Sequence, residues 1–319
     1  MHALLEVRNL TKKFSVGPGA DLVAAQNVSF SLGRGETLGL VGESGSGKTT
    51  VGRCILRLID PTQGRILLDG EDITDLRGDR LRKMRARMQL VFQDPFASLN
   101  PRFTVEQTLA EPLALHGVGR ADRKARIGEI LRQVNLEEPT LRYYPLDLTA
   151  SEQQRVGIAR ALVTRPEFVV LDEPTSMLDP SARAELLALL QSIQRELGTA
   201  YIFISHDLTS VARISHRIAI MYLGHIVEQA PTEAIMARQR HPYSRALLSA
   251  VLFADPTRRP TPYIIDGEIP TAVNPKDECP LYGRCPIRED ACRDGLPPMV
   301  EIQPGHYSSC RRWDHVSAT

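Results

Sequence analysis

The sequence lacks the features that mark membrane-spanning, secreted and nucleic-acid-binding chains. No apolar run approaches the roughly 18 residues that a membrane helix needs, and the N-terminus has no secretory signal pattern. The 39 lysines and arginines are balanced by 38 aspartates and glutamates, so no basic excess favours nucleic acid. We therefore expect a cytoplasmic chain without a nucleic-acid partner, and any link to a membrane must come through other proteins.

Cysteine is also scarce, and its distribution is uneven. Of five cysteines, Cys279, Cys285, Cys292 and Cys310 lie within the last 41 residues, separated by five, six and seventeen residues. In a reducing compartment such clustering favours a metal or cluster over disulfides. The spacing does not match the paired C-x₂-C of most structural zinc sites, whereas four thiolates can hold an iron–sulfur cluster. Zinc and four reduced thiols are the alternatives, and Cys54 is expected to be a small core residue.

The most informative stretch is Gly42 to Thr50, which fits the phosphate-loop pattern G-x-x-x-x-G-K-[ST]. An apolar run at 36–41 precedes it and a segment with helical spacing at 48–58 follows, so a strand, a glycine loop and a helix come in order. This arrangement gathers backbone N–H groups and a helix N-terminus around phosphates. Lys48 would reach the outer phosphates, and Thr49 would hold Mg²⁺ through its hydroxyl.

Other polar residues follow short apolar segments that predict buried strands. Gln93, the pair Asp172 and Glu173, and His206 come after such segments at 88–92, 168–171 and 199–204. Ligands of open α/β sheets bind at the ends of strands. The two acids suggest Mg²⁺ coordination by Asp172 and water activation by Glu173.

An antiparallel layer is predicted near the N-terminus. Apolar segments at 4–10 and 27–32 predict two strands joined by the loop Gly17-Pro18-Gly19, and Phe14 lies just before that loop. Phe14 is either a core aromatic or a platform on which a purine base stacks, since every base has a π-face.

The remaining segments predict the domain organisation. Residues 104–134 have helical spacing with a break near 116–120, which predicts an inserted helical subdomain at about 96–160. The last part of the chain is rich in proline and predicted to be irregular. We expect a phosphate-loop α/β domain at 1–240 and a separate appendage, with the four clustered cysteines, at 241–319.

Taken in order, these motifs resemble those of the ATP-binding subunits of ABC transporters. The phosphate loop is followed by Gln93, a signature-like segment at 148–156, the acids at 172–173, Asp179 and His206. Two further stretches, VFQDPFASLNPR and HPYSRALLSAV, and the cysteine-bearing tail are similar to the oligopeptide/dipeptide/nickel importer branch. The resemblance implies an ABC-type ATPase fold with a helical subdomain, an N-terminal antiparallel layer and a C-terminal domain of the importer type.

The resemblance implies a role for each site residue. Phe14 would stack on adenine, Gln93 would touch Mg²⁺ and the attacking water, and Asp172 would serve the metal. Glu173 would be the general base, and His206 would contact the γ-phosphate. The triphosphate and Mg²⁺ would be held by Gly42, Ser44, Gly45, Gly47, Lys48, Thr49 and Thr50. The tail cysteines would hold a [4Fe–4S] cluster.

The resemblance also implies partners. Family members work as a sandwich dimer that closes on two ATPs and moves two transmembrane permease subunits, and an extracytoplasmic substrate-binding protein belongs to the same system. Asp179 would lie at the contact between the two ATP-binding subunits. The chain would be peripheral at the cytoplasmic face of the membrane. Peptides are the expected substrates, with nickel and other small solutes as alternatives.

Two other functions compete with this interpretation. A soluble ABC-type protein acting on translation or DNA usually has tandem ATPase halves or a long coiled-coil insertion, and neither is visible in the sequence. A catalytically silent subunit is the second alternative. Lys48, Asp172, Glu173 and His206 are all intact, which argues against full silence.

One segment departs from the family pattern. The signature Leu-Ser-Gly-Gly-Gln reads Leu-Thr-Ala-Ser-Glu at 148–152, and it would face the ATP held by the other subunit. Thr149 can keep the hydroxyl, but Ala150 and Ser151 add Cβ atoms where the family has bare backbone. Glu152 adds a negative charge near a polyanion, so binding at this composite site would weaken by about one or two orders of magnitude. The sequence therefore predicts an asymmetric heterodimer with a second ATP-binding subunit whose signature is intact.

Overall fold

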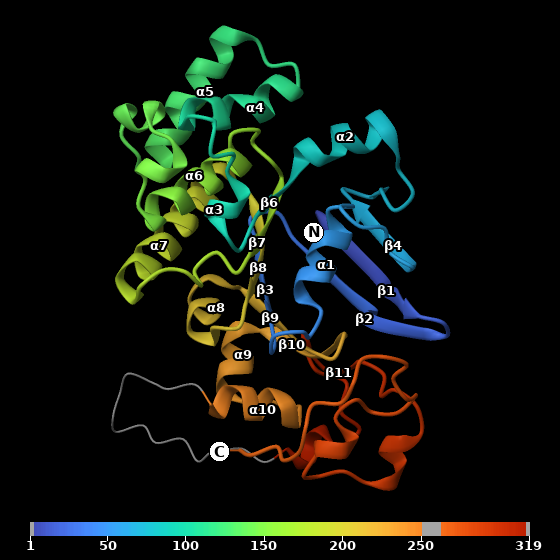
Figure 1. Cartoon of the computed structure of the whole chain (residues 1–319). Helices are drawn as coiled ribbons and strands as arrows, with labels where there is room; N and C mark the ends of the chain where they lie inside the picture. Colours follow the sequence, from blue (N-terminus) through green and yellow to red (C-terminus); the bar gives the residue numbers. More distant parts are fainter. Residues whose placement is uncertain (1–2, 251–262, 317–319) are drawn as a thin grey trace.

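The computed structural model describes residues 3–250 and 263–316. An antiparallel N-terminal sheet lies on one side of a central eight-stranded sheet, and most helices lie on the other side (Figure 1). This is the α/β architecture with a helical subdomain and an N-terminal antiparallel layer that the sequence predicts. In the described residues no helix is long and apolar enough to cross a membrane.

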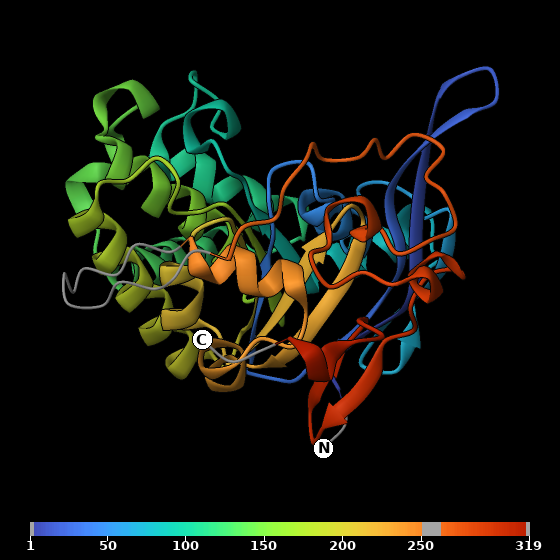
Figure 2. The ribbon, with the colours of Figure 1, turned by 90° about the horizontal axis from the view of Figure 1, so that it is seen from below.

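The N-terminal sheet has the strand order β2-β1-β4-β5. Its strands are β1 (Leu5–Gly17), β2 (Ala20–Leu32), β4 (Gln63–Leu68) and β5 (Glu71–Asp72). The first two form a hairpin much longer than the predicted segments, and its tip projects from the body (Figure 2). The residues near the tip are mostly exposed, and their apolar alternation is limited to Phe14 and Val16, too short to have extended the prediction.

The central sheet has the order β11-β12-β10-β9-β3-β8-β7-β6. Five strands pair in parallel, and every residue of three of them, β3, β7 and β8, is buried, which explains their uninterrupted apolar sequences. The parallel strands are β3 (Thr37–Val41), β6 (Met88–Val91), β7 (Phe168–Asp172), β8 (Ala200–Ser205) and β9 (Arg217–Tyr222). The antiparallel strands are β10 (His225–Pro231), β11 (Val300–Gln303) and β12 (His306–Ser308).

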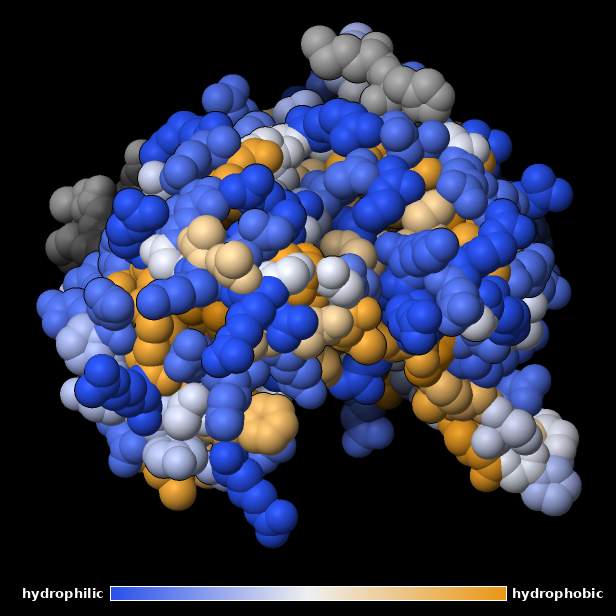
Figure 3. All heavy atoms as spheres, turned by 90° about the horizontal axis from the view of Figure 1, so that it is seen from above, coloured by the Kyte–Doolittle hydropathy of each residue, from blue (hydrophilic) through white to orange (hydrophobic). Residues whose placement is uncertain are grey.

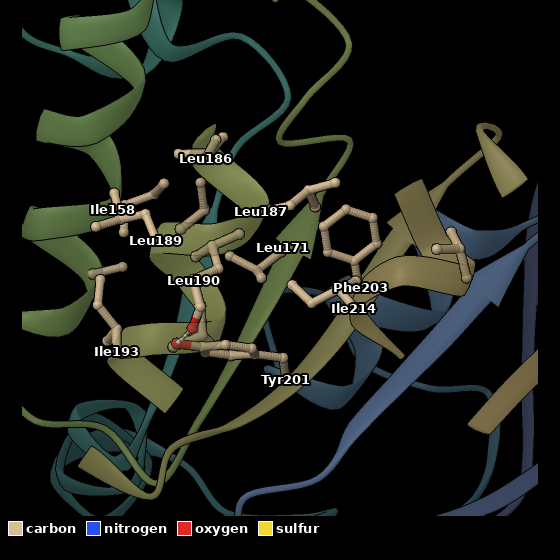
Figure 4. Packing of buried hydrophobic residues seen from close by; sticks show 14 of the residues in the cluster. Ile158, Leu171, Leu186, Leu187, Leu189, Leu190, Ile193, Tyr201, Phe203 and Ile214 are labelled. Carbon is tan, nitrogen blue, oxygen red and sulfur yellow. Dashed lines mark hydrogen bonds between the residues drawn. The ribbon is translucent and has the colours of Figure 1, made fainter. Parts of the chain in front are cut away.

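The two faces of the central sheet bury two separate cores. Helices α1 (Lys48–Ile55) and α2 (Gly78–Arg87) share one core with the N-terminal sheet. On the other face α7 packs its leucines against β7 and β8, and Ile158 of α6 joins them (Figure 4). The helices of that side are α3 (Pro95–Ser98), α4 (Val105–Leu115), α5 (Arg120–Gln133), α6 (Ala150–Leu162), α7 (Pro180–Leu197), α8 (Leu208–Ile214), α9 (Thr232–Ala237) and α10 (Pro242–Ser249). Short 3₁₀ turns lie at Glu138–Arg142, Pro145–Asp147, Tyr282–Arg284, Asp290–Arg293 and Trp313–His315.

The tail, residues 241–319, is more regular in its described part than its proline content predicts. β11 and β12 form a hairpin, and β12 pairs with β10, so the tail extends the central sheet. The buried carboxylate of Glu228 in β10 fixes this junction, because it contacts Nε2 of His306 at 2.7 Å and accepts a hydrogen bond from the backbone of Arg240 at 2.7 Å. The two strands are only four and three residues long and partly exposed, too short for a periodic signal.

Candidate functional site

The phosphate loop turns sharply into α1. Gly47 caps the helix in the left-handed conformation, with a φ of 99°, and a Cβ there would collide with the backbone carbonyl of Ala24. Lys48 is buried, and its ammonium donates to the carbonyl oxygens of Gly42 and Glu43 at 2.7 and 2.8 Å. Ser44 and Gly45 are exposed at the crest of the loop, and Thr50 is half-buried on α1.

The hydroxyl of Thr49 donates a 2.9 Å hydrogen bond to Oδ1 of Asp172, which joins the start of α1 to the end of β7. Burial raises the pKa of Asp172, although the Thr49 hydrogen bond opposes the effect. Burial lowers the pKa of Lys48. A divalent cation beside Asp172 and a phosphate beside Lys48 would each stabilise the charged form that burial disfavours, so these residues fit Mg²⁺ and a polyphosphate.

Glu173 follows β7 in a strained backbone conformation. Its φ is 49°, a left-handed value that is uncommon for a residue other than glycine, and its backbone N–H donates to the carbonyl of Ile204 at 2.9 Å. Nδ1 of His206 lies 2.9 Å from both carboxylate oxygens of Glu173, and the buried Oε2 has no other hydrogen-bond partner within the described residues. A buried carboxylate that an imidazole holds in place, beside a candidate metal ligand, is suited to orienting a water molecule.

Gln93 lines one groove together with Thr49 and Asp172. The groove continues from that polar corner to exposed apolar side chains, among them Phe92 at 40% and Leu115 at 63% exposure. In Figure 3, hydrophobic atoms are also exposed between the left and right halves of the face shown. The strand-to-loop junction predicted at Gln93 is present, because β6 ends at Val91 and α3 begins at Pro95.

Phe14 is not a core residue. Its ring is 36% exposed on β1, opposite Leu22 of β2, and Nζ of Lys12 lies 4.8 Å from the ring centroid. The hairpin projects at the lower right of Figure 3. The ring is therefore available for stacking, as one of the two interpretations of the sequence requires.

Thr149 and Ser151 lie at the start of α6, which packs against α3, α4, α5 and β6 in the helical subdomain rather than against α1. Glu152 forms a capping box there: its Oε2 accepts from the backbone N–H and the hydroxyl of Thr149 at 2.8 and 2.7 Å. These bonds lower the pKa of Glu152. Sequence reasoning treated Glu152 only as an added charge and missed this cap, although the pattern T-x-x-E encodes it.

Asp179, expected from the resemblance at the contact between subunits, caps α7. Its Oδ1 accepts from the backbone N–H groups of Ser181 and Ala182 at 2.9 and 3.0 Å. The preceding Met177 is 67% exposed. The carboxylate therefore fixes the helix start next to an exposed turn.

The cysteines are all free thiols, and Cys54 is a fully buried core residue, as predicted. The four tail cysteines line one small cavity together with Arg311 and Arg312. Burial raises the pKa of Cys279 to about 11 and that of Cys310 to about 12. Among the described residues, however, no group of three or more His, Cys, Asp or Glu side chains is arranged to hold a metal ion.

Sequence reasoning missed one further contact with the phosphate loop. The hydroxyl of Tyr243, in α10, accepts a hydrogen bond from the backbone N–H of Glu43 at 3.0 Å. Tyr243 lies in the HPYSRALLSAV stretch, but no local pattern indicates that its side chain reaches a loop 200 residues away.

Comparisons with known proteins agree with this geometry. The family model for ABC transporters matches residues 25–176, and that for the oligopeptide/dipeptide transporter C-terminal region matches residues 227–292. A putative peptide import ATP-binding protein of Brucella ovis is 47% identical over 97% of this chain and 98% of its own. The oligopeptide transport ATP-binding protein AppF of Bacillus subtilis is 40% identical over 96% of both chains. The dimeric ATP-binding cassette MJ0796, bound to ADP and Pi, superimposes with a TM-score of 0.66 at 30% identity, covering 72% of this chain and 98% of that one.

Proposed function

This chain belongs to the ABC transporter family as an ATP-binding subunit of the peptide-importer type, and we propose that its ATPase site is the corner where the phosphate loop meets β7 and β8. The observation that best supports this location is the 2.9 Å hydrogen bond between Thr49 and Asp172, with Glu173 next in the chain. It brings the phosphate loop, a candidate metal ligand and a candidate base to one point.

Each residue has a distinct role in the proposed reaction. Thr49, Gln93 and Asp172 hold Mg²⁺, which supplies charge neutralisation for the phosphates. Glu173 accepts the proton of the attacking water, and His206 fixes the Glu173 carboxylate and contacts the γ-phosphate. Backbone N–H groups of the loop and the Lys48 ammonium bind the polyphosphate, with Gly42, Ser44, Gly45, Gly47 and Thr50 completing the cradle and Phe14 stacking on the adenine.

We propose that the groove beside Gln93 receives a short helix from a permease subunit. The exposed apolar side chains of Phe92 and Leu115 give that helix a surface to bury, and the same groove ends at Thr49 and Asp172. Docking and the nucleotide site would thus share Gln93. Two permeases would hold the chain at the cytoplasmic face of the membrane, and a substrate-binding protein would deliver peptides from the other side. In this proposal residues 1–240 form the ATPase domain and residues 241–319 the importer-type domain.

We further propose an asymmetric heterodimer. The hydroxyl and the backbone N–H of Thr149 both donate to the carboxylate of Glu152. The partial positive charge at the start of α6 is therefore already neutralised by an anion of its own chain. A γ-phosphate approaching this segment would meet that carboxylate. The second ATP-binding subunit, with an intact signature, would then complete the site built on Lys48, Asp172 and Glu173 of this chain.

The proposed cofactor of the tail is a [4Fe–4S] cluster. Its support is that Cys279, Cys285, Cys292 and Cys310 line the same cavity, and that arginine charges beside Cys279 and Cys285 oppose the burial that raises their pKa values. Cluster thiolates each bind a different iron and so stand farther apart than the ligands of one ion. Because no group of three or more His, Cys, Asp or Glu side chains among the described residues is arranged to hold a metal ion, the shared cavity is the observation on which this proposal depends.

The function is tested on the tagged, full-length chain purified from the membranes of its own cells. We expect two permease subunits and a second ATP-binding subunit to copurify, and the assembly to hydrolyse Mg–ATP and to move peptides into vesicles only when ATP is present. Copurification with ribosomes or DNA would favour the soluble alternative instead. An intact transporter in which this chain's site shows no turnover would favour the silent subunit.

A further inference from the structure

Tyr243 reaches the phosphate loop from the C-terminal part of the chain. Its hydroxyl accepts a hydrogen bond from the backbone N–H of Glu43 at 3.0 Å, while the carbonyl oxygen of the same Glu43 accepts from Nζ of Lys48 at 2.8 Å. Glu43 is the second residue of the loop. Its backbone is therefore held from one side by Tyr243 and from the other by the lysine that binds phosphate in the proposed site.

The position of Tyr243 is itself fixed by packing. The side chain is only 2% exposed, and its ring lies 4.5 Å, centroid to centroid, from the ring of Tyr222 in β9. The hydroxyl of Tyr222 accepts from the guanidinium of Arg284 at 3.2 Å, and Arg284 lies between Cys279 and Cys285 in the chain. Burial raises the pKa of Tyr243, so its hydroxyl is neutral at physiological pH. A rigid, neutral oxygen is thus presented to the loop.

The tail also holds the hairpin on which Phe14 lies. The side chain of Asn274 accepts from the backbone N–H of Asp21 and donates to the carbonyl of Gly19, both at 2.9 Å. Its own backbone N–H donates to the carbonyl of Asp21 at 2.9 Å. Figure 2 shows the tail, in orange and red, beside the dark blue hairpin.

These hydrogen bonds lie close to the exposed ring of Phe14. Leu22 of β2 pairs with Phe14 on one side and bridges Val273 of the tail on the other. A segment of the tail therefore covers the free edge of β2 directly opposite the candidate adenine platform. An unpaired two-stranded hairpin is marginally stable in water, so a third segment at this point limits its motion.

We propose that Tyr243 and Asn274 are positioning residues for ATP, which fix the phosphate loop and the adenine hairpin in the conformation that binds nucleotide. This inference rests on the proposed ATP site. The tail contacts no phosphate or base itself in this proposal; it lowers the cost of ordering the two segments that do. Neither residue takes part in hydrolysis, so the effect falls on nucleotide affinity and not on turnover.

Tyr243→Phe isolates the first contact, because it removes one oxygen and keeps the ring. We expect the purified full-length chain to bind Mg–ATP roughly three- to tenfold more weakly, as the loss of one hydrogen bond predicts, by calorimetric titration. In the assembled transporter the KM for ATP should rise by the same factor while kcat stays the same. Tyr201→Phe is the matched control: it also deletes a buried hydroxyl, which bonds the carbonyl of Leu190 at 3.3 Å (Figure 4), and should leave ATP affinity unchanged.

Asn274→Ala tests the second contact on an exposed residue, whose change should not prevent folding. A similar loss of affinity is expected, with kcat retained. Asn135→Ala is its control, because Asn135 also has a left-handed backbone, with a φ of 53° against 44° for Asn274, but lies in the helical subdomain. Wild-type chain that fails to bind ATP would refute the proposed function. If the wild-type chain binds ATP and both Tyr243→Phe and Asn274→Ala bind it with wild-type affinity, the positioning role alone is overturned. A loss of kcat in step with affinity would overturn it too.

Discussion

Nδ1 of His206 lies 2.9 Å from Oε1 of Glu173, so side chains that follow two neighbouring parallel strands meet at the end of the central sheet. The same nitrogen lies 2.9 Å from the buried Oε2, which has no other hydrogen-bond partner in the described chain. The left-handed backbone of Glu173 directs the carboxylate to this place. The pair therefore resembles a base and the group that orients it.

Glu173→Gln should separate binding from hydrolysis. The amide keeps the shape of the side chain but cannot accept a proton, so ATP should bind with wild-type affinity while turnover falls by about 10²–10⁴-fold. Glu196→Gln, on the exposed side of α7, is the control and should behave as wild type. Steady-state hydrolysis by the assembled transporter measures the effect. Turnover near the wild-type rate in Glu173→Gln would rule out this residue as the base.

Gln93→Ala should uncouple the transporter. Gln93 lines the groove that ends at Thr49 and Asp172, so its loss should reduce peptide uptake per ATP hydrolysed more than it weakens ATP binding. Gln191→Ala, on α7 and hydrogen-bonded to the carbonyl of Arg213, is a control for loss of a surface glutamine. Uptake and hydrolysis are measured in the same vesicles. An equal loss of binding and transport would contradict a coupling role.

Asp172→Asn should stabilise the nucleotide-free chain while abolishing Mg–ATP hydrolysis. Burial raises the pKa of Asp172, so folding penalises its charge at pH 7, and this penalty disappears as the pH falls through the raised pKa. The neutral amide removes the penalty and can still accept the Thr49 hydrogen bond. We expect melting roughly 1–3 °C above wild type at pH 7, with the difference shrinking in acid.

Asp207→Asn provides a control of opposite sign. Although burial alone would raise it, hydrogen bonds from Ser210 and Thr209 and the charge of Arg183 lower the pKa of Asp207 overall. Its charge therefore stabilises the fold above the unfolded pKa, and this contribution is lost as the pH falls through the lowered value. Asp207→Asn should melt below wild type at pH 7. If Asp172→Asn melts below wild type as well, burial does not dominate at Asp172.

In the asymmetric dimer, transport should depend more on Lys48 than on the corresponding lysine of the second ATP-binding subunit. Lys48→Ala should abolish transport, whereas the equivalent change in the second ATP-binding subunit, whose ATP faces 149–152 of this chain, should be milder. Glu152→Gln should strengthen ATP binding at that weak site, because glutamine preserves the capping box and removes the charge. Nucleotide titration of the assembly measures both effects. Equal dependence of hydrolysis on the two lysines would contradict the asymmetry.

The tail cysteines should bind iron in protein purified without oxygen. We expect about four iron atoms per chain and a broad visible absorption, both lost in Cys285→Ser and retained in Cys54→Ala. Because burial raises the pKa of Cys279 to about 11 and that of Cys310 to about 12, cluster formation must release protons and should be favoured at higher pH. Colourless, iron-free protein would refute the cluster, and bound zinc would support the alternative.

Local sequence patterns determined the parts of the site that depend on neighbours in the chain. The glycine spacing at 42–47 and the buried runs of β3, β7 and β8 predicted the phosphate loop and the strand ends at which Asp172, Glu173 and His206 lie. These elements form because backbone conformation and burial repeat over a few residues. The pattern T-x-x-E at Thr149 is equally local, so the cap made by Glu152 was within reach of sequence reasoning.

Tertiary structure alone decided how the tail meets the nucleotide site. Tyr243 bonds to Glu43 across 200 residues of chain, and Asn274 bonds to Asp21 across 253. β12 pairs with β10 because β10 has a free edge, and Glu228 is buried beside His306 at this junction. Such contacts depend on which edges and buried groups the rest of the fold leaves to be paired, and no periodicity within a short segment records that.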